Sequence, residues 1–530
     1  MKRKGLGLVI IALGLGLFMA MLDATIVNIS IPAMMEDFNV GVSSISWVLD
    51  AYLLVLAVLA LTVGRLADQF GRKLVYNIGL SVFTISSLLC ALSWDVSWLI
   101  VFRALQAIGA VVLISVSMAI MTVSFPAEKR GAAMGIWAAI GITAAAIGPT
   151  LGGVIVENMN WNWVFYINIP IGIIAVILSM IALDESKDPT SPKKLDLFGI
   201  IAFSISMFSL VLAFIKGEDW GWGSAGIISL FILAVVFLVV FIFLEKRQLQ
   251  PMLNIGEFRN VTFSSSVACQ ALVGFGMMGA IFLLTLFLQN VLGYSALKAA
   301  VAITPIPAAA LIFSPIGGRI CDKIGARTPT VIGLAAVILG LWLFSQLRVD
   351  SDWGTVAWRA VIVGAGMGLS NPALAVAAMG AGTGGKEGVS SGVLNTSRFV
   401  GMALGVAVCT ALLTSSVNTH LVDAKTEVQA IITENQQIPS QVKEVILEQV
   451  ELLGEGESTM TAPDFAAIAQ EKGIPEEMLP QLEQLGQQII SVIRQHVTKA
   501  FNYIFPWTAG IVFVGIIPAF LLRRPKAKPD

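Results

Sequence analysis

The sequence has few charged residues, and this scarcity excludes several classes of protein. Charged residues make up 13% of the 530 residues, whereas 56% are hydrophobic. An average soluble domain carries about 25% charged residues, so a soluble fold has no place for this surplus of apolar side chains. The formal net charge of -1 provides no basic surface, and we therefore expect no nucleic-acid partner.

Cysteine and histidine are also scarce. Three of the four cysteines lie inside apolar stretches and the fourth lies in a short basic loop, so no pair suggests a disulfide framework or a metal knuckle. The only histidines, His420 and His496, lie in one polar segment without a cysteine or clustered carboxylates beside them. The sequence therefore predicts no metal site, and we expect no cofactor.

Long apolar blocks, in contrast, are abundant. They run for about 20 residues or more, the length a helix needs to cross a hydrocarbon core of about 30 Å at 1.5 Å per residue. We predict an all-α polytopic membrane protein with 14 transmembrane helices. The predicted spans are residues 6–35, 46–67, 74–94, 97–123, 131–156, 161–183, 195–216, 223–244, 261–290, 298–318, 328–347, 356–382, 389–415 and 500–522.

Lysine and arginine are distributed unevenly over the predicted loops. With the N-terminus placed in the cytosol, 22 of the 33 Lys and Arg residues lie on that side, against four on the short opposite loops and their edges. Five more lie in or beside one long polar loop, and Arg103 and Arg398 lie inside predicted spans. This pattern satisfies the positive-inside rule, so we expect both termini in the cytosol.

One short polar pattern occurs twice. The loops at residues 64–72 and 318–327 share the frame G-R-x-x-D-x-x-G, 254 residues apart. Chance recurrence is the alternative, but both copies fall in matching loops, and duplicated halves around a central site are a transporter architecture. We therefore predict an N-terminal six-helix bundle at 1–184, two inserted transmembrane helices at 185–250 and a C-terminal six-helix bundle at 251–530.

Residues 416–498 form the one long polar insertion. They carry 13 Asp and Glu residues against four basic ones. Apolar residues recur at helical spacing in 441–453 and 475–497, which indicates a small helical cap over the outer mouth. A solvated, mobile hairpin is the alternative. We expect this acidic loop, between the thirteenth and fourteenth spans, to be extracellular.

Two charged residues lie deep inside spans of the first bundle. Asp23 lies roughly 13 Å and Arg103 roughly 9 Å from the outer ends of their helices. An ionisable group at membrane depth costs at least about 2.5–3.5 kcal/mol on insertion scales, so it usually faces a cavity or a partner. We expect these two side chains to approach each other, either on an ion pathway or as a structural ion pair.

Five other polar residues in the spans are candidates for a substrate cavity. Asp50 lies about one turn from the outer end of the second span, and Arg398 lies roughly 15 Å into the thirteenth. The candidates are Asp50, Asn28, Gln106, Arg398 and Asn395.

The segments around these residues resemble the major facilitator superfamily, and within it the fourteen-helix drug:proton antiporter branch. The resemblance extends over nearly the whole chain and departs at Ala107 and Ala144, where glycine is usual, and at Asn162, where arginine is common. It rests on the segments Leu22–Pro32, Trp47–Tyr52, Gly64–Lys73, Arg103–Ala110, Gly148–Gly153 and Trp161–Pro170.

The resemblance implies roles for three groups of residues. Asp23 and Arg103 would couple transport to protons. A conformational latch, bridging helix ends across the two halves, would comprise Gly64, Arg65, Asp68, Gly71, Arg72 and Lys73. An antiporter helix motif would comprise Gly148, Pro149, Gly152 and Gly153. A solvated basic loop and simple close packing of helices are the alternative explanations for the second and third groups.

The resemblance also implies a function. It predicts the major facilitator fold and a proton-coupled antiporter that exports small amphipathic compounds, such as drugs, across the bacterial cytoplasmic membrane by alternating access. The alternative is export of an endogenous lipid, peptide or siderophore by the same mechanism. A channel would need a pore-lining repeat and an enzyme a catalytic cluster, and neither is visible. We expect a monomer, not an enzyme, whose partners are its substrate, protons and the lipid bilayer.

Overall fold

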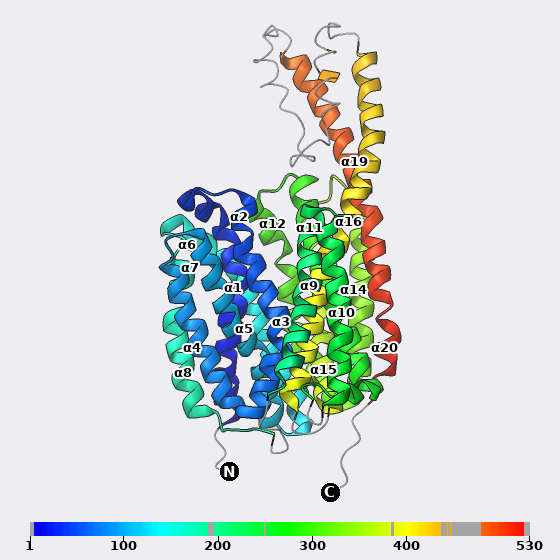
Figure 1. The fold of residues 1–530 in the computed structure, drawn as a ribbon. Coiled ribbons are helices and arrows are strands. Elements are labelled where there is room, and N and C mark those ends of the chain that lie inside the picture. The colour runs from blue at the N-terminus through cyan, green and yellow to red at the C-terminus, as the bar shows by residue number, and fades with distance from the viewer. Residues whose placement is uncertain are drawn as a thin grey trace.

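The computed structural model describes residues 5–188, 195–248, 251–382, 386–435, 443, 446–447 and 479–523. Within these residues, 14 helices are long and apolar enough to cross a membrane. The predicted number of spans is therefore confirmed. The helices stand side by side, and two of them continue far beyond the others at one end of the molecule (Figure 1).

Six long helices from the first part of the chain pack into one bundle. The short helices α2 (Val42–Ile45) and α7 (Trp163–Tyr166) precede two of them. Buried aliphatic and aromatic residues from these helices form its core, with Tyr76 and Phe83 completely enclosed. The six helices are α1 (Leu6–Phe38), α3 (Trp47–Phe70), α4 (Arg72–Ala91), α5 (Val96–Ser124), α6 (Arg130–Asn158) and α8 (Asn168–Ala182).

Six later helices form a second bundle with its own core. Phe287 packs edge-on against Phe501, and Phe344 packs against Phe505, so aromatic pairs join helices distant in sequence. Short helices α12 (Ala296–Ile303) and α20 (Ile516–Leu521) flank it. The six are α11 (Val261–Asn290), α13 (Pro305–Ile324), α14 (Arg327–Phe344), α15 (Trp353–Ala381), α16 (Glu387–Glu434) and α19 (Leu479–Phe513).

The helices α9 (Leu197–Trp220) and α10 (Ala225–Arg247) lie between these bundles in the sequence. α9 packs along α10 and contacts both α3 and α16, one helix from each bundle. On α10, residues 228, 232, 235 and 239 recur at helical spacing, are all Ile or Val, and are 47–61% exposed. A helix that exposes such a face is suited to contact with lipid.

Helix boundaries follow from side-chain caps and from one glycine. Asp95 accepts a hydrogen bond from the Ser97 amide at the start of α5, which occupies one of the free amides of the first turn. Gly71 separates α3 from α4 with φ of 122°, a conformation that side-chain-bearing residues rarely adopt. The chain can therefore turn between these helices within a single residue.

The two bundles meet closely at one end of the molecule. The beginning of α1 and the helix α20 both lie at this end, which we call the terminal end (Figure 1). Gly64 abuts the backbone of Gly388, and Gly131 abuts the backbone of Gly318. A Cβ atom at any of these positions would overlap the facing backbone, so glycine is what permits the bundles to touch here.

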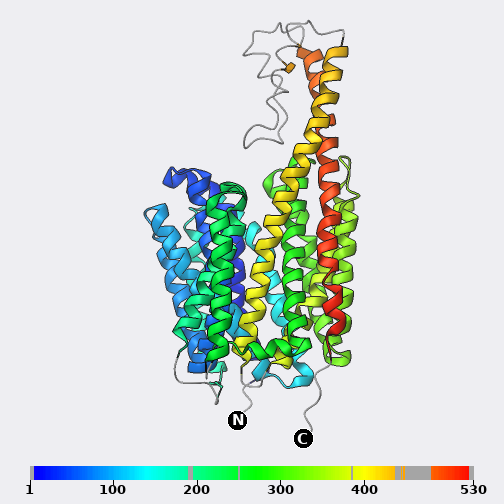
Figure 2. The same cartoon turned by 45° about the vertical axis from the view of Figure 1, so that its right-hand side comes forward.

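The opposite end carries an extension formed by α16 and α19, and we call it the extension end. Both helices continue past the predicted span limits at 415 and 500, so each helix is longer than its predicted membrane span (Figure 2). Apolar residues keep their helical spacing beyond those limits and pack the two helices together: Leu421, Val428 and Ile432 from α16, and Leu485, Ile489 and Ile493 from α19. Most of the helix expected at 441–453 lies outside the described residues.

Candidate functional site

A polar network lies inside the first bundle around Asp23 of α1. The Asp23 carboxylate accepts hydrogen bonds from Arg103 Nη1 of α5 at 2.5 Å, from Gln106 Nε2 at 2.9 Å and from Asn168 Nδ2 of α8 at 3.2 Å. All four side chains are completely buried. Three donors converge on one carboxylate, an arrangement that suits its ionised form.

The Arg103 guanidinium has further partners that fix its position. Its Nε donates to the Val48 carbonyl oxygen at 3.2 Å and its Nη1 donates to Gln106 Oε1 at 2.7 Å. The Tyr52 ring faces it, with the guanidinium carbon 4.2 Å from the ring centroid. Arg103 is thus held by a counter-ion, two neutral acceptors and an aromatic face, which together compensate for its removal from water.

The expected approach of Asp23 and Arg103 is therefore found in the structure, and Gln106 belongs to the same network. Sequence reasoning missed three members: Ser87, which receives hydrogen bonds from Gln106 and Asn168, Asn168 itself, and Tyr52. Tyr52 and Asn168 stand inside the segments that carried the family resemblance. Ser87 lies in an unmarked apolar span, and nothing in its sequence surroundings distinguishes it.

The terminal end holds a polar contact between α3 and α16. Asp68 accepts from the amides of Gly388 and Val389, the first turn of α16, at 2.9 Å each. Arg72 pairs with Asp68 at 2.7 Å and with Glu387 at 2.7 Å. Asp68 therefore caps α16 of the other bundle rather than α4, the helix that follows it in sequence. We call this set the first clamp.

The second copy of the frame makes the matching contact. Asp322 of α13 accepts from the amides of Gly131 and Ala132, in the first turn of α6, at 2.7 and 2.9 Å. Each frame aspartate thus occupies free amides at a helix N-terminus, where the helix dipole favours negative charge. We call this the second clamp. The two clamps join the bundles through both copies of the repeated pattern.

The remaining frame residues brace the first clamp. Lys73 donates to the carbonyl oxygens of Met180 and Leu183 at 2.8 and 2.7 Å, which ties α4 to the end of α8. The Arg65 side chain is buried, 4% exposed, beside Asp68. A Cβ atom at position 71 would clash with the Glu185 carboxyl group, so glycine is required there.

The glycine motif of α6 faces the helix that carries Asp23. Gly148 packs on Thr25 and Gly152 packs on Ile26, so α6 approaches α1 within one turn of Asp23. Pro149 lies within the helix between them. A Cβ at Gly153 would meet no atom within 4 Å, so this glycine is not needed for the contact.

Asp50 lies apart from the network. Its carboxylate pairs with Lys216 of α9 at 2.9 Å, and Lys216 also pairs with Asp219 at 3.2 Å. Asp50 therefore ties an inserted helix to the first bundle.

The other predicted cavity residues are scattered. Asn28 is exposed and bonds to the Ala24 carbonyl oxygen of its own helix. Asn395 of α16 is buried and donates to Ser115 of α5 at 3.4 Å, across the two bundles. Arg398, one turn further, has no ion pair with any other described residue. The structure does not bring these residues together into one site.

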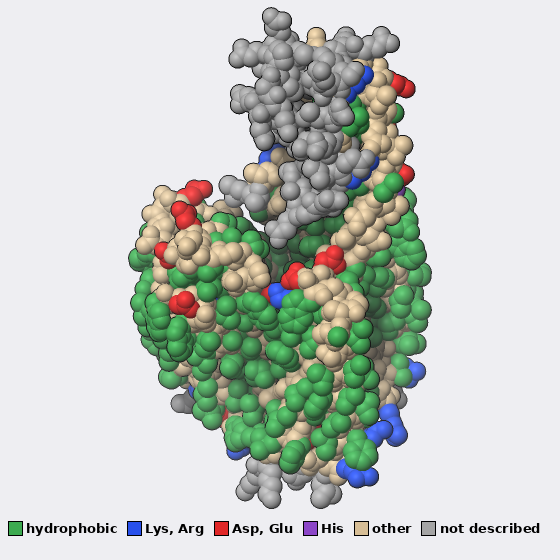
Figure 3. Space-filling model, turned by 45° about the horizontal axis from the view of Figure 1, so that its top comes forward, with side chains coloured by type: hydrophobic (Ala, Val, Ile, Leu, Met, Phe, Trp, Pro, Cys, Tyr) green, Lys and Arg blue, Asp and Glu red, His purple; other side chains and the backbone are tan. Residues whose placement is uncertain are grey.

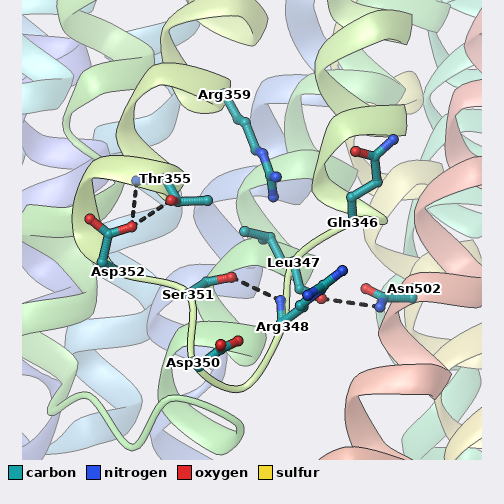
Figure 4. A pocket seen from close by; sticks show the side chains of 9 residues that line it. All are labelled: Gln346, Leu347, Arg348, Asp350, Ser351, Asp352, Thr355, Arg359 and Asn502. Carbon is teal, nitrogen blue, oxygen red and sulfur yellow. Dashed lines mark hydrogen bonds between the residues drawn. The ribbon is translucent and has the colours of Figure 1, made fainter.

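A cavity of about 570 Å³ lies away from the network, at the extension end of the second bundle (Figure 4). It is lined by the loop between α14 and α15 and by Asn502 of α19. Hydrogen bonds from the Thr355 side chain and amide lower the pKa of Asp352 at its rim. Arg359 points into it, 9% exposed, with Nε and Nη1 unpaired among the described residues. This cavity is thus separate from the site defined by Asp23.

These features define a multi-pass membrane protein of two bundles, with a buried ionic network in one and paired polar contacts between them. A family model described as Major Facilitator Superfamily matches residues 13–406. The chain belongs to the Major Facilitator Superfamily, whose members are transporters rather than enzymes.

Individual relatives agree with this assignment. The chain is 35% identical over 409 residues to Multidrug resistance protein Stp of Mycobacterium tuberculosis, covering 77% of this chain and 75% of that protein. It is 31% identical to the Tetracenomycin C resistance and export protein of Streptomyces glaucescens (77% and 76% covered), and 33% identical to the Multidrug transporter protein MdtP of Bacillus subtilis (80% and 78%).

Solved structures show the same fold. The human organic anion transporter MFSD10 superposes with a TM-score of 0.60, covering 98% of this chain and 100% of that one. The sequence identity is 13%, so the likeness extends to the fold alone.

Proposed function

We propose that this protein exports small amphipathic compounds across a bacterial cytoplasmic membrane in exchange for protons. The substrates are drugs or toxic organic molecules. Relatives from three bacterial genera carry names of multidrug or antibiotic resistance and export, which supports this substrate class. The alternative is export of an endogenous compound. Transport assays with a substrate panel that includes lipids, peptides and siderophores distinguish the two functions.

The buried network around Asp23 is the observation that carries the proposal. Asp23 is a titratable group enclosed at membrane depth, and polar donors from α5 and α8 surround it. A carboxylate that binds a proton loses its attraction for Arg103 and turns from a pure acceptor into a donor. Proton binding at Asp23 therefore changes the packing of three helices at once.

The clamps supply the second part of the mechanism. In this conformation the first and second clamps hold the bundles together at the terminal end. For a solute to enter from that side, both clamps must open and the bundles, residues 1–184 and 251–530, must rock apart. The inserted helices within 185–250 remain at the seam. Protonation of Asp23 would bias this equilibrium because each state exposes the carboxyl differently.

The terminal end is the cytosolic end in this proposal. The Lys and Arg distribution of the short loops supports it. The protein works as a monomer, because each chain contains both bundles and both clamps.

The test is proton-linked transport in everted membrane vesicles, comparing the wild type with Asp23→Asn. Asn preserves the shape of the side chain but removes the titration. We expect the variant to lose substrate-induced proton movement and uphill accumulation, while downhill exchange continues.

Asp219→Asn is the matched control, because Asp219 is an exposed carboxylate outside the network. It is expected to transport like the wild type. Uphill, proton-dependent transport by well-expressed Asp23→Asn would reject this role and direct attention to Asp50.

A further inference from the structure

The only two histidines of the chain meet in the structure. His420 lies on α16 and His496 on α19, 76 residues apart in sequence, in the extension beyond the membrane. Asp423 lies one turn from His420 on the same face of α16. One ring nitrogen of each histidine and a carboxylate oxygen of Asp423 all lie within 4.8 Å of one another. The sequence predicts no metal here because nothing in it shows that the two histidines converge.

One ring nitrogen of His496 is paired with a carboxylate, and the other is unpaired among the described residues. It is 7% exposed, and its Nε2 lies 2.9 Å from Glu427 Oε2. Its Nδ1 is buried and has no hydrogen-bond partner among the described residues. A carboxylate that accepts the Nε2 proton leaves Nδ1 as a free lone pair, which is the usual arrangement of a histidine ligand and its supporting carboxylate.

From this geometry we propose that His420, Asp423 and His496 bind one Zn²⁺-like transition-metal ion, which fastens α16 to α19. Two imidazoles and one carboxylate suit zinc and exclude a preference for Ca²⁺ or Mg²⁺, which favour oxygen ligands alone.

The distances and exposure fit this ion. Tetrahedral zinc with bonds of about 2.0–2.2 Å spaces its ligand atoms about 3.3–3.6 Å apart, so side-chain rotation suffices to close the present spacing. The Asp423 side chain is 66% exposed and that of His420 is 28% exposed, which leaves a path for the ion and room for a water as fourth ligand. The apolar contacts between α16 and α19 already align the two helices.

The site would act as a clip within one bundle. α16 and α19 both belong to the second bundle, so joining them does not lock the two bundles together. The inference is therefore independent of the proposed transport cycle. Metal binding should raise the stability of the extension without being required for transport.

The experiment uses the full chain in detergent, purified through an affinity tag without histidine and stripped with EDTA. Titration with Zn²⁺ should give one ion per chain and a rise in melting temperature, with no response to Mg²⁺. His420→Gln and His496→Gln should each weaken Zn²⁺ binding at least tenfold. Glu427→Gln, which removes the supporting carboxylate, should weaken it about 10–100-fold. Glu434→Gln, an exposed carboxylate further along α16, is the control and should bind like the wild type.

A measurement on the wild type alone tests the proposal even if the variants fail to fold. Diethylpyrocarbonate modifies histidines, and this chain has only two. Bound Zn²⁺ should protect both from modification. Absence of protection, or equal Zn²⁺ affinity of the wild type and a folded double variant of both histidines, would overturn the proposal.

Discussion

The pair Asp23 and Arg103 places two opposite charges where no water reaches them. Both side chains are completely buried, and the pair is held at 2.5 Å. Removing ions from water is costly, and the cost is recovered only with close geometry and additional hydrogen bonds. Gln106, Asn168 and the Val48 carbonyl oxygen supply those bonds. The network is therefore stable as a unit and sensitive to the loss of any member.

Replacing Arg103 tests this dependence. Arg103→Met leaves the Asp23 carboxylate buried without its counter-ion, and losing one partner of a buried pair costs about 3–5 kcal/mol. We expect a clear fall in the thermal unfolding temperature in detergent. Asp219→Asn removes an ion pair whose acid is 62% exposed, and such pairs contribute about 1 kcal/mol or less. Equal unfolding temperatures for the two variants would contradict the structural importance of the network.

The sequence predicts this network only in part. Charged residues at membrane depth are conspicuous because they are costly, so Asp23 and Arg103 stand out. Ser87 does not stand out, since a serine inside an apolar span has a low free-energy cost of insertion and is common. Its role depends on α4 facing α5 and α8, which is a property of the packing. Arg398 and Asn28 are candidates from the sequence because of their positions within the spans. Position alone does not show which helix faces they occupy, and in the structure neither belongs to the network around Asp23.

At the scale of elements, each clamp is a helix cap supplied by the other bundle. Asp68 occupies amides at the start of α16, and Asp322 occupies amides at the start of α6. Such caps are intact only while the helix ends are in register. The clamps therefore respond to rigid-body motion of the bundles without any change inside a helix.

Asp68→Asn tests the first clamp. Asn cannot pair ionically with Arg72 and accepts with only one oxygen, so it weakens two contacts between the bundles. We expect normal membrane insertion and little change in substrate affinity, but a transport rate reduced about tenfold, corresponding to about 1.4 kcal/mol. Transport assays with a binding measurement on the same preparation separate the two effects. A wild-type transport rate at normal expression would contradict a role of the first clamp in the transport cycle.

The matched control for this clamp is Asp322→Asn. It changes the corresponding aspartate of the second clamp, which lacks an Arg72-like ion pair among the described contacts. We therefore expect a smaller reduction in rate than for Asp68→Asn.

Element boundaries show where sequence reasoning succeeds and fails. The number of spans is correct because length and apolarity decide it directly. The helices α16 and α19 extend beyond the predicted span limits at 415 and 500 because hydropathy falls there while the helical apolar spacing continues. Residues such as Leu421 and Ile489 continue the pattern into polar sequence, and only the packing of these two segments, 68 residues apart, reveals a shared core.

At the scale of the whole molecule, an apolar band lies between two polar ends. Hydrophobic side chains cover the flank, and charged side chains lie towards both ends (Figure 3). A lipid bilayer accommodates only the apolar band, so the helices cross the membrane with one end of the molecule on each side. Which end faces the cytosol depends on the loops, and the proposal places the terminal end there.

Single-cysteine labelling determines which end of the molecule faces the cytosol. In a cysteine-free background, Thr426→Cys reports on the extension and Lys246→Cys on the terminal end, since both positions are exposed. The native Cys321 is a poor reporter because it is buried. With an impermeant maleimide on intact cells, we expect position 426 to react at once and position 246 only after permeabilisation. Positively charged short loops favour the cytosolic side during insertion, and the reverse labelling pattern would contradict the topology expected on this basis. It would then place both clamps at the outer face, and the direction of transport inferred from them would be wrong.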